Sequence, residues 1–144
     1  MSSRKGHHLL DINVLIALVF EDHVHHIAVK GWFNSDPVWT LCPFTEAGFL
    51  RFATDSLRGG LGIREATGIL DKLAAQPGYR YISASSDWST LTRPFLNRLH
   101  GHNQVTDAFL LGLALQADLI LTTFDRALLH LAGEHAAHVR LLGK

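Results

Sequence analysis

Along most of this chain, short apolar runs alternate with longer segments in which apolar residues recur at helical spacing. Apolar runs bounded by turn residues are typical of buried strands, and strands that alternate with helices pair in parallel. The sequence therefore predicts an α/β fold in which helices cover both faces of a parallel sheet. The expected strands are residues 8–10, 38–41, 79–83, 119–122 and 139–142.

The helices expected between these strands are bounded by Pro and Gly clusters or by capping residues. Pro43 opens one of them, as Pro does in a first helical turn. Pro94 is expected to bend or restart another, because its ring and its missing N–H interrupt a helix. The expected helices are residues 13–19, 25–33, 43–57, 63–75, 88–99, 105–117 and 125–131.

Size and composition favour one globular unit. With 144 residues, of which 47% are hydrophobic and 18% charged, the chain can form a well-filled core. No repeat or linker divides it, so we expect residues 1–144 to form a single domain. Cys42 is the only cysteine, which excludes an internal disulfide and a cysteine-based zinc site. We see no signal-peptide pattern and no apolar stretch of membrane length, and expect a cytoplasmic protein.

The charge balance does not by itself indicate a nucleic-acid-binding protein. The chain has 13 basic and 13 acidic residues, whereas such proteins usually present a basic face. The segment from Arg51 to Arg98 holds seven basic residues against four acidic ones, which makes it the better candidate for phosphate contact. An ordinary mixed surface explains the same segment equally well.

Three acidic residues are placed at one edge of the predicted sheet by topology. Asp11 ends the first strand, Asp125 follows the fourth, and Glu46 lies in the first turn of the helix after the second strand. Ligands of a parallel sheet bind at the carboxyl ends of its strands. A fourth acid, Asp107, is embedded in a helix with little polar surface. Because an unpartnered buried carboxylate is costly, Asp107 is expected to be hydrogen-bonded, paired or metal-bound.

Clustered carboxylates without a neighbouring Lys or Arg suit a hard divalent cation such as Mg²⁺ or Mn²⁺. Each acid also has a purely structural alternative. Asp11 and Asp125 can cap helices, Glu46 can be a first-turn acid, and Asp107 can pair with an internal Arg. The ten histidines form no zinc pattern, because the His-x-x-x-His spacing is absent from their first cluster.

Four blocks of sequence contain these acids in order. They are residues 10–18, 45–51, 105–110 and 121–125, and they span nearly the whole chain. No single block is specific, but as an ordered set they resemble the PIN-domain nucleases, and among these the VapC-type toxins of prokaryotic toxin–antitoxin pairs. The resemblance implies a three-layer α/β/α sandwich with a mostly parallel five-stranded sheet, usually as a homodimer.

The resemblance also implies a metal-dependent endoribonuclease that uses Mg²⁺ or Mn²⁺, cuts RNA and is inhibited by a cognate antitoxin. The acidic positions of the family are matched by Asp11, Glu46, Asp107 and Asp125. We expect Asp11 and Asp107 to bind the metal directly, and the other two directly or through water.

Shorter polar side chains complete the predicted site. Asn13 and Thr123, each two positions from an acid, match small polar positions of the family and are candidates for holding a ligand water. The candidates for RNA contact are Arg51, Arg58 and His102. For Arg51 a role as a helix-surface charge is the alternative.

Rival functions use Asp11 differently or not at all. A phosphatase or phosphotransferase with Asp11 as nucleophile usually has a second carboxylate where this chain has Asn13. A non-catalytic phosphoacceptor module of flavodoxin type usually has a late Lys near the site, whereas the only Lys after Lys72 is the terminal Lys144. A nuclease fold retained only for partner binding is a third alternative.

Overall fold

A parallel five-stranded sheet forms the middle of the computed structural model, which describes residues 6–143. The strands follow the order β3-β2-β1-β4-β5, and every neighbouring pair is parallel. The predicted α/β fold is therefore confirmed. The strands are β1 (His7–Leu10), β2 (Val38–Leu41), β3 (Tyr79–Tyr81), β4 (Ile120–Thr123) and β5 (Val139–Leu141).

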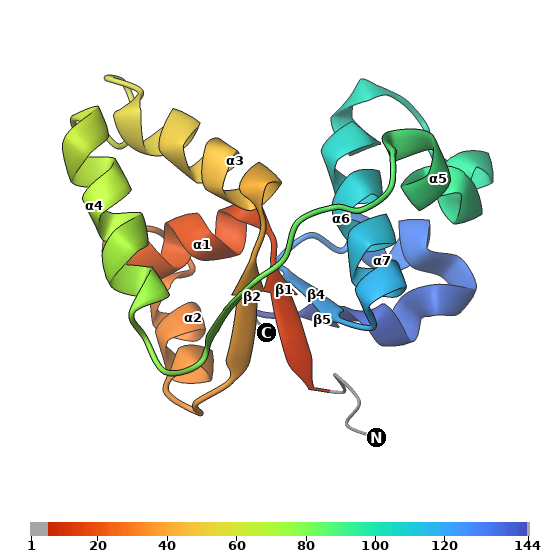
Figure 1. The fold of residues 1–144 in the computed structure, drawn as a ribbon, viewed down its shortest axis with the longest axis horizontal. Coiled ribbons are helices and arrows are strands. Elements are labelled where there is room, and N and C mark those ends of the chain that lie inside the picture. The colour runs from red at the N-terminus through yellow and green to blue at the C-terminus, as the bar shows by residue number, and fades with distance from the viewer. Residues whose placement is uncertain (1–5, 144) are drawn as a thin grey trace.

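Helices cover both faces of the sheet, so the three-layer arrangement is confirmed as well. The first four helices lie on one side of the strands and the last three on the other (Figure 1). The helices are α1 (Ile12–Val19), α2 (His26–Phe33), α3 (Pro43–Thr54), α4 (Ile63–Ala74), α5 (Trp88–Thr92), α6 (Val105–Ala117) and α7 (Ala127–Ala132). Three 3₁₀ segments accompany them, at Arg93–Arg98, His102–Gln104 and Gly133–His138.

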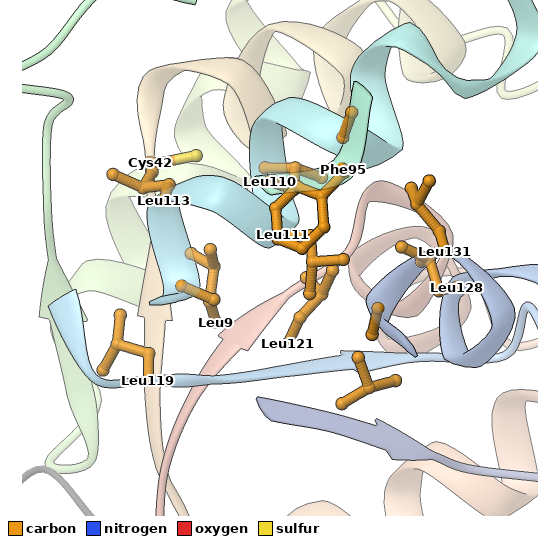
Figure 2. Close-up of a cluster of buried hydrophobic side chains, with 14 residues drawn as sticks. Leu9, Cys42, Phe95, Leu110, Leu111, Leu113, Leu119, Leu121, Leu128 and Leu131 are labelled. Atoms are coloured by element: carbon orange, nitrogen blue, oxygen red, sulfur yellow. The ribbon is translucent and has the colours of Figure 1, made fainter. Parts of the chain in front are cut away.

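Each face of the sheet carries its own apolar core, because successive residues of a strand point to opposite faces. Leu9 packs with Leu111, Leu121 and Phe95 on the side of α6 and α7 (Figure 2). Its neighbour Leu10 belongs to the other core, on the side of α1 to α4. All of these side chains are fully buried. Each contributes about 1.5–3 kcal/mol to folding, and together they hold β1 between the two layers.

Most helices lie within one or two residues of their predicted bounds, and two end earlier for local reasons. The helix expected over residues 88–99 stops at Thr92, and the chain continues as a 3₁₀ segment that contains Pro94. Pro lacks the N–H that would continue an α-helix, so the predicted restart is confirmed. Helix α3 ends at Thr54 rather than at residue 57. There the Asp55 carboxylate accepts the Leu57 N–H at 2.9 Å, which turns the chain instead.

The chain connections reverse direction between β1 and β4, and the ends of these two strands are the expected ligand-binding position. Strand β1 pairs with β2 on one side and with β4 on the other. The chain reaches β2 through α1 and α2, on one face, and leaves α6, on the opposite face, for β4. In open parallel sheets ligands bind outside the strand ends at such a reversal. Over residues 6–143, no helix combines the length and apolar character of a membrane crossing.

Candidate active site

Asp11 lies at the junction of β1 and α1, where it is only 6% exposed. It is the N-cap of α1, and its Oδ1 accepts the Ile12 N–H at 2.8 Å. Its Oδ2 accepts the hydroxyl of Thr123 at 2.7 Å. Burial raises the pKa of Asp11, the two hydrogen bonds lower it, and the charge of Asp125 raises it further. The predicted capping role of Asp11 is thus real, and it leaves a buried carboxylate at the sheet edge.

Asp107 lies in the first turn of α6 and is half-buried. Burial is the main reason that its pKa rises to about 7, and the charges of Asp11 and Asp125 add to the rise. A carboxyl group whose ionisation is opposed by two others lies in their electrostatic field. Asp11 and Asp125 therefore lie close enough to Asp107 for their charges to oppose its ionisation.

Thr123 connects two of these acids although it lies 112 residues from Asp11 in the sequence. It is fully buried at the end of β4. Its hydroxyl donates to Asp11 and accepts the backbone N–H of Asp125 at 3.0 Å. The Asp125 carboxylate in turn accepts the Ala127 N–H at 2.9 Å, at the start of α7. One hydroxyl thus fixes the Asp11 carboxylate against the backbone of Asp125.

Glu46 occupies a different part of the sheet edge. It lies in the first turn of α3, as predicted, and its Oε1 accepts the hydroxyl of Tyr81 at 3.0 Å. Partial burial, the hydrogen bond to Glu46 and the Glu46 charge together raise the pKa of Tyr81 to about 12. Glu46 is not among the charges that shift the pKa of Asp11 or Asp107. Its predicted contact with a shared cation stays a prediction.

Tyr81 was missed from the sequence, although it ends a strand at the same edge as the acids. The predicted strand runs from residue 79 to 83, so Tyr81 is expected inside it; the strand ends at Tyr81 instead, which puts its hydroxyl near Glu46. Thr45, next to Glu46, was also missed. Its buried hydroxyl donates to the Leu10 carbonyl at 3.0 Å and so joins α3 to the end of β1.

These side chains suit a hard divalent cation in the type of their donor atoms, though not in their spacing. Between residues 6 and 143 the ion pairs are Arg58 with Asp55 and His135 with Glu134, so none of the four acids is neutralised by a described Arg, Lys or His. In the same part of the chain, no three His, Cys, Asp or Glu side chains form a group that could hold a metal ion. Carboxylate oxygens are among the donors that Mg²⁺ and Mn²⁺ prefer.

The remaining predicted residues lie around the acids. Asn13 is exposed on α1 and lines a pocket between α1 and α3 together with Arg51 and Arg58. His102 is exposed in the 3₁₀ segment that precedes α6. No hydrogen bond between described residues joins Asn13 or His102 to a candidate acid, and their roles stay predictions.

Comparison with known proteins finds a matching family and several relatives. The PIN domain family matches residues 8–134. Ribonuclease VapC38 of Mycobacterium tuberculosis (strain ATCC 25618 / H37Rv) is 38% identical over 128 residues, which cover 86% of this chain and 89% of that protein. Ribonuclease VapC29 of Mycobacterium tuberculosis (strain CDC 1551 / Oshkosh) is 35% identical over 129 residues, which cover 89% and 92%.

Two crystal structures share the fold at low sequence identity. One is Mycobacterium tuberculosis VapC20, described as a toxin that cleaves the sarcin–ricin loop, with a TM-score of 0.64, 15% identity, and coverage of 84% of this chain and 92% of that one. The other is FitAcB from Neisseria gonorrhoeae, with a TM-score of 0.61, 19% identity, and coverage of 93% and 95%. At such identities the likeness shows the fold alone.

Proposed function

This chain belongs to the PIN domain family, and from that membership we propose that it is a metal-dependent endoribonuclease, the toxin of a toxin–antitoxin pair. The observation that carries the proposal is the placement of Asp11, Asp107 and Asp125. Asp11 and Asp125 lie at the ends of β1 and β4, their charges oppose the ionisation of Asp107 in the first turn of α6, and no described cation is paired to the three. Relatives that are named ribonucleases and align over most of their length support the same activity.

The cofactor of this proposal is Mg²⁺ or Mn²⁺, held directly by Asp11 and Asp107 and directly or through water by Asp125 and Glu46. When bound, such a cation supplies an activated water and offsets the charge that builds on the phosphate. Hard carboxylate donors and the absence of thiolate or paired imidazole among them support these two metals over zinc.

The residues of the chain contribute orientation and proton transfer. Thr123 and the Ile12 N–H fix both oxygens of Asp11, and Tyr81 fixes one oxygen of Glu46. A carboxylate of this set takes a proton from the attacking water. In-line attack on phosphorus breaks the bond to the 3′ oxygen, so the products carry a 5′-phosphate and a 3′-hydroxyl.

The test replaces one acid at a time without changing its size. Asp11→Asn and Asp107→Asn are expected to lose at least about 100-fold in RNA cleavage, measured with Mn²⁺, with Mg²⁺ and with a chelator. Asp118→Asn is the matched control, because Asp118 is exposed at the end of α6 and its backbone is left-handed, a conformation that Asn tolerates. Full activity and growth toxicity of Asp11→Asn would contradict the proposal.

The biological setting follows from the toxin assignment. We propose a cognate antitoxin as protein partner, RNA as substrate, a homodimer, and action in the cytoplasm, with residues 1–144 acting as one nuclease domain. An exposed apolar surface supports a protein–protein interface. On it, Phe44 and Trp88 are each more than a third exposed and line an apolar pocket of about 570 Å³. Light scattering of the purified chain, alone and with the product of a neighbouring short gene, measures both assemblies.

A further inference from the structure

Helices α1 and α3 lie side by side (Figure 1), and residues of both line a pocket that includes Ile12, the residue after Asp11. Its volume is about 390 Å³. Two arginines and the Asn13 amide supply its polar groups, and Ile12, Ile16 and Phe52 supply apolar surface. From this pocket we propose that the protein binds a phosphate of the RNA strand adjacent to the one that is cut. The inference rests on the proposed ribonuclease activity and names a substrate-binding site for it.

Position connects the pocket to the acids. Ile12 and Asn13 directly follow Asp11 at the start of α1. Arg51 follows Glu46 on α3 by five residues, which is about 7.5 Å along a helix. Helices α1 and α3 touch closely at the pocket, since a Cβ added to Gly48 would lie 2.5 Å from Ile12 Cδ1. An RNA strand that reaches the acids therefore has the pocket next to it.

Charge favours an anion in the pocket. Arg51 and Arg58 line it together with a single acid, Asp55, so its formal charge is +1. The pair between Arg58 and Asp55 is 3.8 Å long, and both side chains are well exposed, at 64% and 42%. Such an exposed pair contributes little and does not neutralise the arginine. The acids Asp11 and Asp107 have no described cation paired with them, so this region and the pocket differ in charge.

Arg51 is available for a ligand. It forms no hydrogen bond or ion pair with another residue of the described part of the chain. Arg58 lies 5.9 Å from the centre of the Phe52 ring, which steadies its guanidinium at the pocket wall. Guanidinium groups donate two parallel hydrogen bonds to a phosphate.

Two other arginines of the basic middle segment are already engaged. Arg98 donates to the carbonyls of Leu131 and Ala132, at 2.9 and 3.3 Å. Arg80 donates to the Tyr79 carbonyl at 2.7 Å. The fold thus uses these cations to satisfy backbone groups, and Arg51 and Arg58 keep their donors for phosphate.

Binding is measured apart from cleavage. A fluorescein-labelled single-stranded RNA of 12 nucleotides is titrated with protein in a chelator, and anisotropy gives affinity at several salt concentrations. Arg51→Gln and Arg58→Gln are each expected to weaken binding by about 5–10-fold and to reduce the salt slope by about 0.7, the value for one lost phosphate contact on a single strand. Arg64→Gln is the matched control, because Arg64 is exposed on α4 and does not line the pocket.

Further variants separate phosphate binding from its alternatives. Arg51→Lys keeps the positive charge but loses the planar guanidinium that donates two parallel hydrogen bonds. It is expected to retain the salt slope and part of the affinity for RNA. Slopes and affinities equal to those of Arg64→Gln, or no RNA binding by the unmodified protein, would overturn the inference. So would arginine variants that lose affinity for poly-glutamate but not for RNA, because the pocket would then bind an acidic peptide. Loss of RNA cleavage in Asp11→Asn tests the ribonuclease proposal separately, since the anisotropy experiment needs no turnover.

Discussion

The two ends of the carboxylate edge are built differently. At the ends of β1 and β4, Asp11 is buried and both of its oxygens are hydrogen-bonded from neighbouring strands or helices. In the first turn of α3, Glu46 is held by one bond from Tyr81, which is 49% exposed. Buried bonds in a low dielectric fix geometry more firmly than exposed ones. Removing one hydrogen-bonding group near Asp11 should therefore reduce activity more than removing one near Glu46.

The largest expected effect is at Asp107. Asp107→Asn removes a charge that burial and two other acids disfavour. The metal-free variant is expected to be more stable than the unmodified protein by about 1–3 kcal/mol, after allowance for solvent screening, while cleavage falls at least about 100-fold. Thermal unfolding in a chelator and RNA cleavage with Mn²⁺ measure the two effects. Added Mn²⁺ should raise the melting temperature of the unmodified protein and not that of the variant; equal rises would contradict the metal role.

The next effect is at Thr123. Thr123→Val keeps the shape of the side chain and removes both the donor to Asp11 and the acceptor for the Asp125 N–H. We expect a loss of about 10–100-fold in activity or metal affinity, as for other groups that orient metal ligands. Thr54→Val is the control, because the Thr54 hydroxyl bonds only within α3, to Leu50. An equal loss in both variants would show a general effect of removing a hydroxyl.

At the other end a smaller effect is expected. Tyr81→Phe removes the single bond to Glu46, whose free energy is about 0.5–1.5 kcal/mol. Cleavage should fall by about 2–10-fold. Tyr79→Phe, whose hydroxyl forms no bond to Glu46, should leave the rate unchanged. A loss in Tyr81→Phe as large as that in Thr123→Val would break the contrast between the two ends.

The smallest effect on activity, and a measurable one on stability, is expected at His8. His8 Nδ1 lies 2.9 Å from the Thr122 hydroxyl across β1 and β4. Burial, with the charges of Arg140 and His7, lowers the pKa of His8 to about 4. Because an unfolded chain binds a proton at His8 near pH 6.5, His8 should lower the free energy of unfolding by about 1–2 kcal/mol as pH falls from 6.5 toward 4, after allowance for screening. The raised pKa of Asp107 acts in the opposite direction over the same range, so a comparison with a His8 variant isolates this contribution.

Urea unfolding across this pH range checks the effect. His8→Gln, which keeps a polar group near Thr122, should lose less free energy of unfolding than the unmodified protein as pH falls. The control is His130→Gln, since His130 is exposed on α7. If the free energy of unfolding of His8→Gln changes with pH as it does in the unmodified protein, a group other than His8 causes the change.

Much of the fold followed from the sequence because its strongest patterns are local. Pro94 indicated a helix restart, and the apolar runs indicated the strands, since both depend on neighbours within a few residues. The position of Asp11 and Asp125 at strand ends also followed from topology. The bond from Tyr81 to Glu46 did not, because it depends on the register of β3 beside β2. Likewise, the charge count could not show that Arg98 is used on backbone carbonyls while Arg51 stays available.

The Thr45 hydroxyl connects the two ends of the carboxylate edge through one hydrogen bond. It anchors the helix of Glu46 to the carbonyl that immediately precedes Asp11. Any molecule that tilts α3, whether RNA or protein, must carry the tip of β1 with it or break a fully enclosed bond. The distance between the carboxylates of Asp11 and Glu46 should therefore change little when a partner binds.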